Sequence, residues 1–197
     1  GGTWNREGVI LFTTLGFGLY RVSPTGAELE LLRSYDRTHQ EFNYISPSFL
    51  PDGRHFLYFI QSGSRDTNGV YVGSIDGTLK QRLLGNNTNA SYAASASGSG
   101  GYLIFVRERA LMAQPFDAQR LKLTGEPIPI AEHVARDLTN SRANFSVSDD
   151  GVLVYDGNVN RESKQLVWVD REGKLIRSLG AIGSWGQPAL SPDEKRI

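Results

Sequence analysis

The sequence of 197 residues contains no cysteine, so disulfides, thiolate metal sites and a cysteine nucleophile are excluded. It also carries no surplus charge, because 21 lysines and arginines balance 21 aspartates and glutamates. A neutral chain gives no electrostatic reason to expect a nucleic acid or an anionic membrane as partner. The longest nearly apolar run, residues 9–20, is interrupted by glycine and threonine and is far shorter than the ~20 apolar residues of a membrane-spanning helix. We therefore expect no direct membrane insertion.

Motifs for catalysis and metal binding are missing as well. The histidines, His39, His55 and His133, stand alone and show no spacing typical of metal ligands. The acidic turn at residues 148–151 fits a structural turn better than a calcium loop, which needs ~6 to 8 oxygen ligands. The sequence has no nucleophile elbow, no phosphate-binding loop and no kinase signature. We expect a chain that is not an enzyme and that holds neither a metal nor a cofactor.

What the sequence does contain is a short turn motif that recurs along its whole length. Copies lie at residues 47–54, 96–101, 145–151 and 189–196, with a degenerate copy at residues 4–8. The turn positions are Gly8, Gly53, Gly100, Gly151 and Glu194, which lie about 46 residues apart. A regular period of this size indicates a repeat architecture.

An apolar run rich in branched and aromatic residues follows each turn, and a second such run comes next, which predicts a series of β-strands. Asp76-Gly77 between two later runs is typical of a hairpin turn, so each copy is expected to be an antiparallel meander of four strands. The run at residues 56–59 does not alternate with polar residues and must be covered on both faces. This favours a β-propeller over a sandwich or barrel, whose strands leave one face to water.

The sequence therefore predicts an all-β protein, a β-propeller of four-stranded antiparallel blades of about 46 residues. We expect a single propeller segment over residues 1–197, with blades at 1–44, 45–89, 90–141 and 142–185 and the start of the next at 186–197. About four blades are present, and both ends of the chain fall inside expected structure, so we expect a larger propeller in the complete protein.

One alternative, a closed four-bladed ring, stays open. The sequence shows no innermost strand in the first copy, and residues 187–191 could supply one to close a four-bladed ring.

Two of the turn motifs carry a family resemblance. Leu50-Pro51-Asp52-Gly53 and Ser191-Pro192-Asp193-Glu194 resemble the repeat of TolB-like, WD-repeat-like propellers. Residues 111–117, 123–127, 151–155 and 166–174 are similar to the propeller that follows the kinase domain in many bacterial receptor-like serine/threonine kinases. This resemblance implies a sensor or scaffold module in a periplasmic or other extracytoplasmic location. The same repeat occurs in periplasmic translocation proteins and in peptidases and hydrolases, so an accessory propeller with a separate catalytic domain is the alternative.

Polar loops at one mouth of the propeller are the expected binding surface, because loops on a rigid scaffold commonly carry function. They lie at residues 33–44, 63–68 and 156–164, and the candidate binding residues are Tyr35, Phe42, Tyr44, Arg65, Asp66 and Arg161. Their mixture of charge and aromatic rings suits a protein, peptide or small ligand. An incomplete ring would leave a sheet face or edge open to self-association. An active site of side chains that converge near the axis also stays open, because one sequence does not show convergence.

Overall fold

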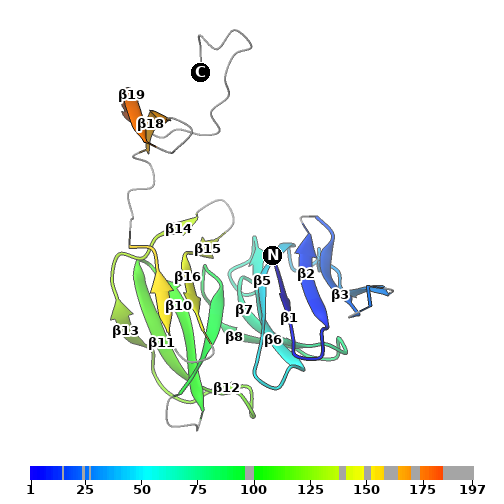
Figure 1. The fold of residues 1–197 in the computed structure, drawn as a ribbon. Helices are drawn as coiled ribbons and strands as arrows, with labels where there is room; N and C mark the ends of the chain where they lie inside the picture. The colour runs from blue at the N-terminus through cyan, green and yellow to red at the C-terminus, as the bar shows by residue number, and fades with distance from the viewer. Residues whose placement is uncertain are drawn as a thin grey trace. The chain divides into compact units, whose positions relative to one another are not determined.

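The computed structural model describes residues 1–14, 16–23, 25–26, 28–95, 100–137, 141–148, 152–157, 164–169 and 174–183. The chain divides into two compact units, Gly1–Gly157 and Asn158–Ile197. Every regular element in the described residues is a β-strand, and the strands form antiparallel sheets (Figure 1). The all-β class predicted from the sequence is therefore confirmed.

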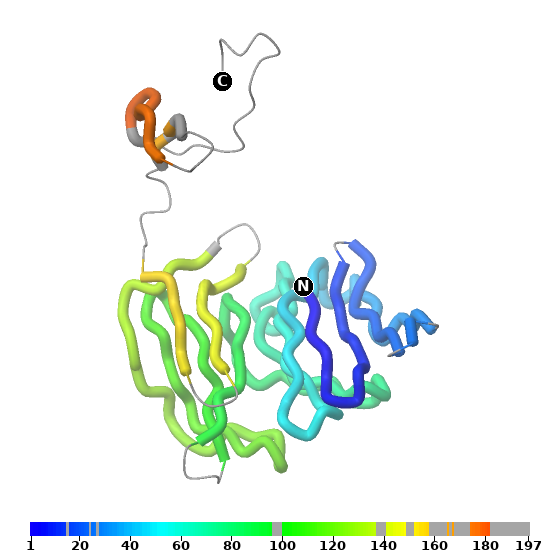
Figure 2. The backbone as a smooth tube through the Cα atoms, viewed as in Figure 1, coloured from blue at the N-terminus to red at the C-terminus, as the bar shows by residue number. Residues whose placement is uncertain are grey.

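Two sheets of the first unit are four-stranded meanders, in which each strand pairs with the next along the chain (Figure 2). The first sheet contains β1 (Gly2–Trp4), β2 (Ile10–Thr14), β3 (Gly18–Val22) and β4 (Leu29–Arg33). The second sheet contains β5 (Glu41–Phe49), β6 (His55–Ser62), β7 (Gly69–Ser74) and β8 (Lys80–Leu84). The four-stranded antiparallel repeat expected from the sequence is thus present.

The third sheet follows the same plan but divides its last strand. It contains β9 (Ala90–Ala94), β10 (Gly101–Arg107), β11 (Ala110–Asp117), β12 (Lys122–Leu123) and β13 (Ile128–Ala131). Both β12 and β13 pair with β11. Two short pairs complete the first unit: β14 (Arg136–Asp137) with β15 (Arg142–Ala143), and β16 (Phe145–Val147) with β17 (Leu153–Tyr155). In the second unit, β18 (Lys164–Val169) pairs with β19 (Leu175–Gly183).

One expectation about the first copy is wrong. The sequence interpretation gave it no innermost strand, whereas β1 occupies that place and pairs with β2, with Trp4 opposite Ile10. A strand of three residues is too short to show a periodic apolar pattern, which is why it escaped notice. Residues 187–191, the alternative source of such a strand, lie outside the described residues.

Glycines mark equivalent places in the first two sheets. Gly18 begins β3 and Gly69 begins β7, and both have positive φ angles, of 130° and 156°. A Cβ atom at Gly18 would collide with the carbonyl of Arg33, and one at Gly69 would collide with the carbonyl of Leu84. Only glycine therefore lets the last residues of the fourth strand come this close to the start of the third.

The core of the first unit lies between successive sheets. Along β6, Phe56, Tyr58 and Ile60 pack into a cluster with residues of the first sheet. The intervening Leu57 and Phe59 pack into a second cluster with residues of the third sheet. Because neighbouring side chains of a strand point to opposite faces, β6 is covered on both sides. This confirms the expectation drawn from its unbroken apolar run.

The strand β10 repeats this arrangement one sheet further along the chain. Leu103 and Phe105 face the second sheet. Ile104 and Val106 pack with residues from the region of β14 to β17, including Ala143. The first unit is thus a succession of sheets whose middle members are buried on both faces.

Candidate functional site

A groove runs between the first strands of successive sheets. The strands β1, β5 and β9 are each the edge strand of their sheet, and β16 belongs to a two-stranded pair. Segments around all four strands line a cavity of about 770 Å³, which we call the axial groove. A volume in this range suits a small molecule or a short peptide, for which pockets measure ~300 to 1,000 Å³.

Asn5 ties the first strand of one sheet to the turn of the next. Its side-chain oxygen accepts hydrogen bonds from the backbone N–H groups of Glu7 (3.1 Å) and Val9 (2.9 Å). Its side-chain nitrogen donates to the carbonyl of Gly53, at 2.8 Å. Gly53 has a φ angle of 66°, as expected for the turn that follows β5. Asn5 therefore holds β1 beside β5 at the end of the groove where the turns lie.

The lining of the axial groove combines aromatic rings with small polar groups. Trp4 is 76% exposed, and Ser48, Ser91 and Ser146 contribute hydroxyls. Serine hydroxyls both donate and accept hydrogen bonds, and edge strands present backbone N–H and C=O groups. The groove therefore carries the groups needed to bind a polar ligand or an extended peptide.

Asp52 is a carboxylate of the groove lining that has a structural partner. Its Oδ2 lies 2.5 Å from Nδ1 of His55, and its Oδ1 accepts from the backbone N–H groups of Arg54 and His55. Partial burial raises the pKa of Asp52, but these hydrogen bonds outweigh it and bring the pKa below its usual value. Asp52 thus remains ionised and fixes the turn between β5 and β6.

A smaller pocket lies where two of the predicted loops meet. The hydroxyl of Ser62 donates to the carbonyl of His39 at 2.8 Å, and the N–H of Gly63 donates to the carbonyl of Gln40 at 3.2 Å. The loops at residues 33–44 and 63–68 are therefore neighbours. The cavity beside them measures about 290 Å³ and is lined by Phe42, Gln61, Ser62, Asn68, Asn87, Arg136 and Ser141. We call it the Phe42 pocket.

The candidate binding residues fall into different environments. Phe42 is 46% exposed and lines the Phe42 pocket. Arg65 and Asp66 are exposed in the neighbouring loop, but they do not belong to the lining of this pocket. Arg161 lies outside the described residues.

Tyr35 and Tyr44 are core residues, which corrects their expected place in a binding loop. They are 9% and 1% exposed, and their rings meet edge to face with centroids 4.7 Å apart. The hydroxyl of Tyr35 donates to the carbonyl of Thr14 at 2.9 Å. Burial is the main factor that raises the pKa of Tyr44, and its hydrogen bond to Glu41 adds to this. Both side chains are therefore occupied inside the protein.

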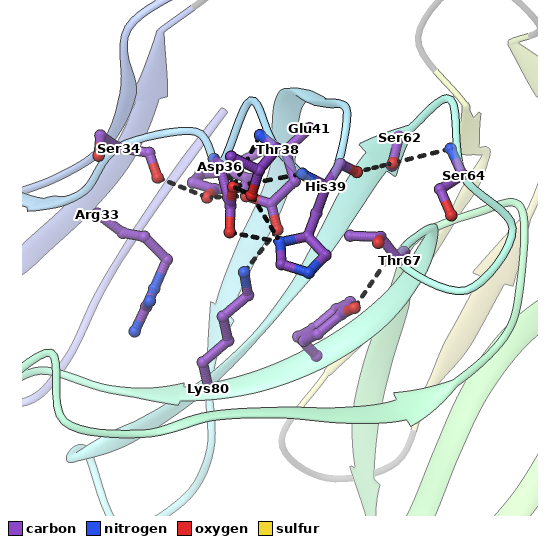
Figure 3. Close-up of polar contacts among 12 residues, drawn as sticks. Arg33, Ser34, Asp36, Thr38, His39, Glu41, Ser62, Ser64, Thr67 and Lys80 are labelled. Atoms are coloured by element: carbon purple, nitrogen blue, oxygen red, sulfur yellow. Dashed lines mark hydrogen bonds and ion pairs between the residues drawn. The ribbon is translucent and has the colours of Figure 1, made fainter.

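A buried carboxylate at the start of β5, next to Phe42, supports the loop that precedes this strand, and no sequence pattern signals it. The side chain of Glu41 is fully buried and lies 2.6 Å from the Tyr44 hydroxyl and 2.5 Å from Nζ of Lys80. It also accepts from the backbone N–H of Asp36, at 2.9 Å. Figure 3 shows Lys80 reaching from the opposite edge of the second sheet toward this cluster. Glu41 thus joins the loop, the first strand and the last strand of the second sheet.

A second carboxylate, Asp36, shapes the same loop. Hydrogen bonds from Thr38 and His39 hold the pKa of the Asp36 carboxyl below its usual range. Nδ1 of His39 lies 2.6 Å from Oδ2 of Asp36 (Figure 3). The loop before β5 is therefore fixed by polar contacts, which places Phe42 at the rim of its pocket.

The described residues contain no group of three or more histidine, aspartate or glutamate side chains placed to hold a metal ion. In the same part of the chain, no helix is long and apolar enough to cross a membrane.

No protein-family model matches the chain, and no curated protein does. Among solved structures, a luciferin-regenerating enzyme is 10% identical, with a TM-score of 0.49 over 88% of this chain and 59% of that one. An auxiliary nutrient-binding protein from Bacteroides thetaiotaomicron VPI-5482 is 8% identical, with a TM-score of 0.36 over 94% of this chain and 58% of that one. The chain thus spans less than two thirds of the length of either protein.

Proposed function

We propose that the chain is a non-catalytic β-propeller module that binds a ligand in the axial groove. The observation that carries this proposal is the convergence of β1, β5, β9 and β16 on one groove. The first strands of propeller blades gather around a central channel in the same way. Burial of β6 and β10 on both faces supports the stacking of blades around an axis.

The proposed ligand is an extended peptide or a small polar molecule. Edge strands offer backbone hydrogen bonds to a peptide, and side-chain pockets then supply selectivity. The exposed ring of Trp4 and the hydroxyl of Ser146 are the groups that we assign to ligand contact. A sensory role beside a bacterial receptor-like serine/threonine kinase, in an extracytoplasmic compartment, rests on the sequence resemblance alone.

The test uses a displayed library of random peptides, selected on the immobilised full chain. Selected peptides are then measured against Ser146→Trp, which fills the groove from an exposed strand position. The matched control is Ser178→Trp, an exposed serine of β19 in the second unit. We expect the first variant to weaken binding at least about tenfold, a change of ~1.4 kcal/mol, and the second to leave it unchanged.

Circular dichroism of both variants shows whether they keep their β-structure. A folded Ser146→Trp variant that binds every selected peptide with the affinity of the original chain would exclude the axial groove as the binding site. A library that gives no binding peptide would exclude peptides as the ligand class.

A further inference from the structure

The Phe42 pocket is a second candidate site, and it shares no lining residue with the axial groove. Its walls come from five places along the chain: the start of β5, the end of β6, the loop before β7, the segment after β8 and the region of β14 and β15. We propose that this pocket binds a sugar ring that carries a carboxylate, such as a hexuronic acid. This inference goes beyond the proposed binding of a ligand in the groove.

Hydrogen bonds between its own walls hold the pocket open. The backbone N–H of Ser62 donates to Oδ1 of Asn68, at 3.2 Å. The Nδ2 atom of Asn68 donates to the carbonyl of Asn86 at 2.9 Å and to Oδ1 of Asn87 at 3.1 Å. Gln61 in turn donates to the hydroxyl of Ser141, at 3.3 Å. A ligand would therefore meet a preorganised site and would not have to order these side chains on binding.

Arg136 gives the pocket its preference for an anion. It is exposed, and none of the carboxylates whose side chains the structure describes lies within ion-pair distance of its guanidinium. The other described lining residues are amides, hydroxyls and one aromatic ring, so Arg136 is the one charged side chain among them. A guanidinium binds a carboxylate through two parallel hydrogen bonds, which makes a carboxylate the matching group.

The rest of the lining favours a sugar over a simple anion. Asn87 and Ser141 already accept hydrogen bonds from the pocket wall, which leaves their own N–H and O–H groups for a ligand. Amides and hydroxyls both donate and accept, as sugar hydroxyls do, whereas a bare carboxylate only accepts. A volume of about 290 Å³ lies at the lower end for ligand pockets and suits one ring.

Phe42 supplies the apolar surface for the face of the ring. It is 46% exposed although its neighbours Glu41 and Asn43 are buried, and it belongs to none of the three core clusters. Two residues with left-handed backbone flank the pocket: Gln40 has a φ of 56° and Ser141 a φ of 55°. Such conformations cost free energy and are concentrated at ligand sites. They are consistent with a site built for binding.

The experiment is isothermal titration of the full chain with galacturonate, galactose and acetate. We expect galacturonate to bind at least about tenfold more tightly than the neutral sugar, because its carboxylate forms charge-assisted hydrogen bonds with the guanidinium of Arg136. Arg136→Gln and Phe42→Ala should each weaken galacturonate binding, the first by roughly tenfold to a hundredfold. The matched controls are Arg120→Gln and Phe17→Ala, which change exposed residues outside the pocket.

Several results would overturn the proposal. If acetate binds as tightly as galacturonate, the pocket recognises an anion and not a sugar ring. If galactose binds as tightly as galacturonate, Arg136 does not select for the carboxylate. A polyaspartate peptide that binds through Arg136 while galacturonate does not would make the partner an acidic protein. Arg136→Lys keeps the positive charge, so it separates loss of the charge from misfolding as the cause of weaker binding. This variant should bind galacturonate more weakly than the original chain but more tightly than Arg136→Gln. Ser146→Trp in the axial groove should leave galacturonate binding unchanged, so the two proposals can fail separately.

Discussion

The first and second sheets have the same strand order and the same pairing, but they differ in what covers them. In the second sheet, Tyr58 lies opposite Tyr71, and these residues are 1% and 6% exposed. In the first sheet, Phe12 lies opposite Tyr20 with the rings stacked at 5.6 Å. On that same face, Trp4, Ile10, Leu29 and Leu31 are between 37% and 76% exposed. We call this the outer face of the first sheet.

The difference shows that burial here is a property of the stack and not of the single sheet. Opposite residues in paired strands share a face, so the pairings show which side chains lie together. In both sheets, apolar side chains lie on both faces. The second sheet has a neighbouring sheet on either side. In the first sheet, the described residues of the first unit cover only the face that packs against the second sheet. Substitutions at matched positions should therefore have very different effects in the two regions.

The largest effect is expected for Phe59→Ala in the second sheet. Phe59 is 1% exposed and packs between the second and third sheets, so truncation should lower the free energy of unfolding by ~3 to 5 kcal/mol. The control is Phe17→Ala, at a position that is 69% exposed between β2 and β3, where a change within ~0.5 kcal/mol is expected. Urea unfolding followed by tryptophan fluorescence measures both. Equal losses in the two variants would contradict the stacking of sheets.

A smaller loss should follow from Lys80→Met, which removes the partner of the buried Glu41 carboxylate. The expected cost is ~2 to 4 kcal/mol, because an uncompensated charge stays in the core. The matched variant is Arg54→Met in the exposed pair of Arg54 and Asp76, where less than ~1 kcal/mol should be lost. Chemical unfolding at neutral pH compares the two. A loss for Arg54→Met as large as that for Lys80→Met would show that exposure does not distinguish the pairs.

Removal of a hydroxyl should have opposite effects at two tyrosines of the second sheet. Tyr44→Phe deletes the hydrogen bond to the Glu41 carboxylate and should cost ~1 to 3 kcal/mol. The Tyr58 hydroxyl is buried and has no hydrogen-bond partner among the described residues, so Tyr58→Phe should be neutral or should stabilise by ~1 kcal/mol. Thermal unfolding of the two variants gives the comparison. A clear loss for Tyr58→Phe would reveal a partner for that hydroxyl, such as a buried water.

The same comparison shows which features the sequence could predict. Burial on both faces leaves an unbroken apolar run, so the run at residues 56–59 predicts β6 at its observed position. The Phe42 pocket could not be found, since it joins five polar segments that have no common pattern. The expected start of the second blade at residue 45 puts Tyr44 in the preceding loop. In fact β5 begins at Glu41, and no local pattern shows that a charged residue will be buried by a distant lysine.

The smallest effect is expected on the outer face of the first sheet. Leu29 in β4 is 65% exposed, so Leu29→Lys should change the free energy of unfolding by less than ~0.5 kcal/mol. Leu84→Lys in β8, the fourth strand of the second sheet, places a charge at a position that is 8% exposed and should cost more than ~3 kcal/mol. A loss above ~1 kcal/mol for Leu29→Lys would mean that the outer face is covered in solution. Sedimentation velocity over a range of protein concentrations would then show whether a second copy of the chain covers it, as the expectation of self-association requires.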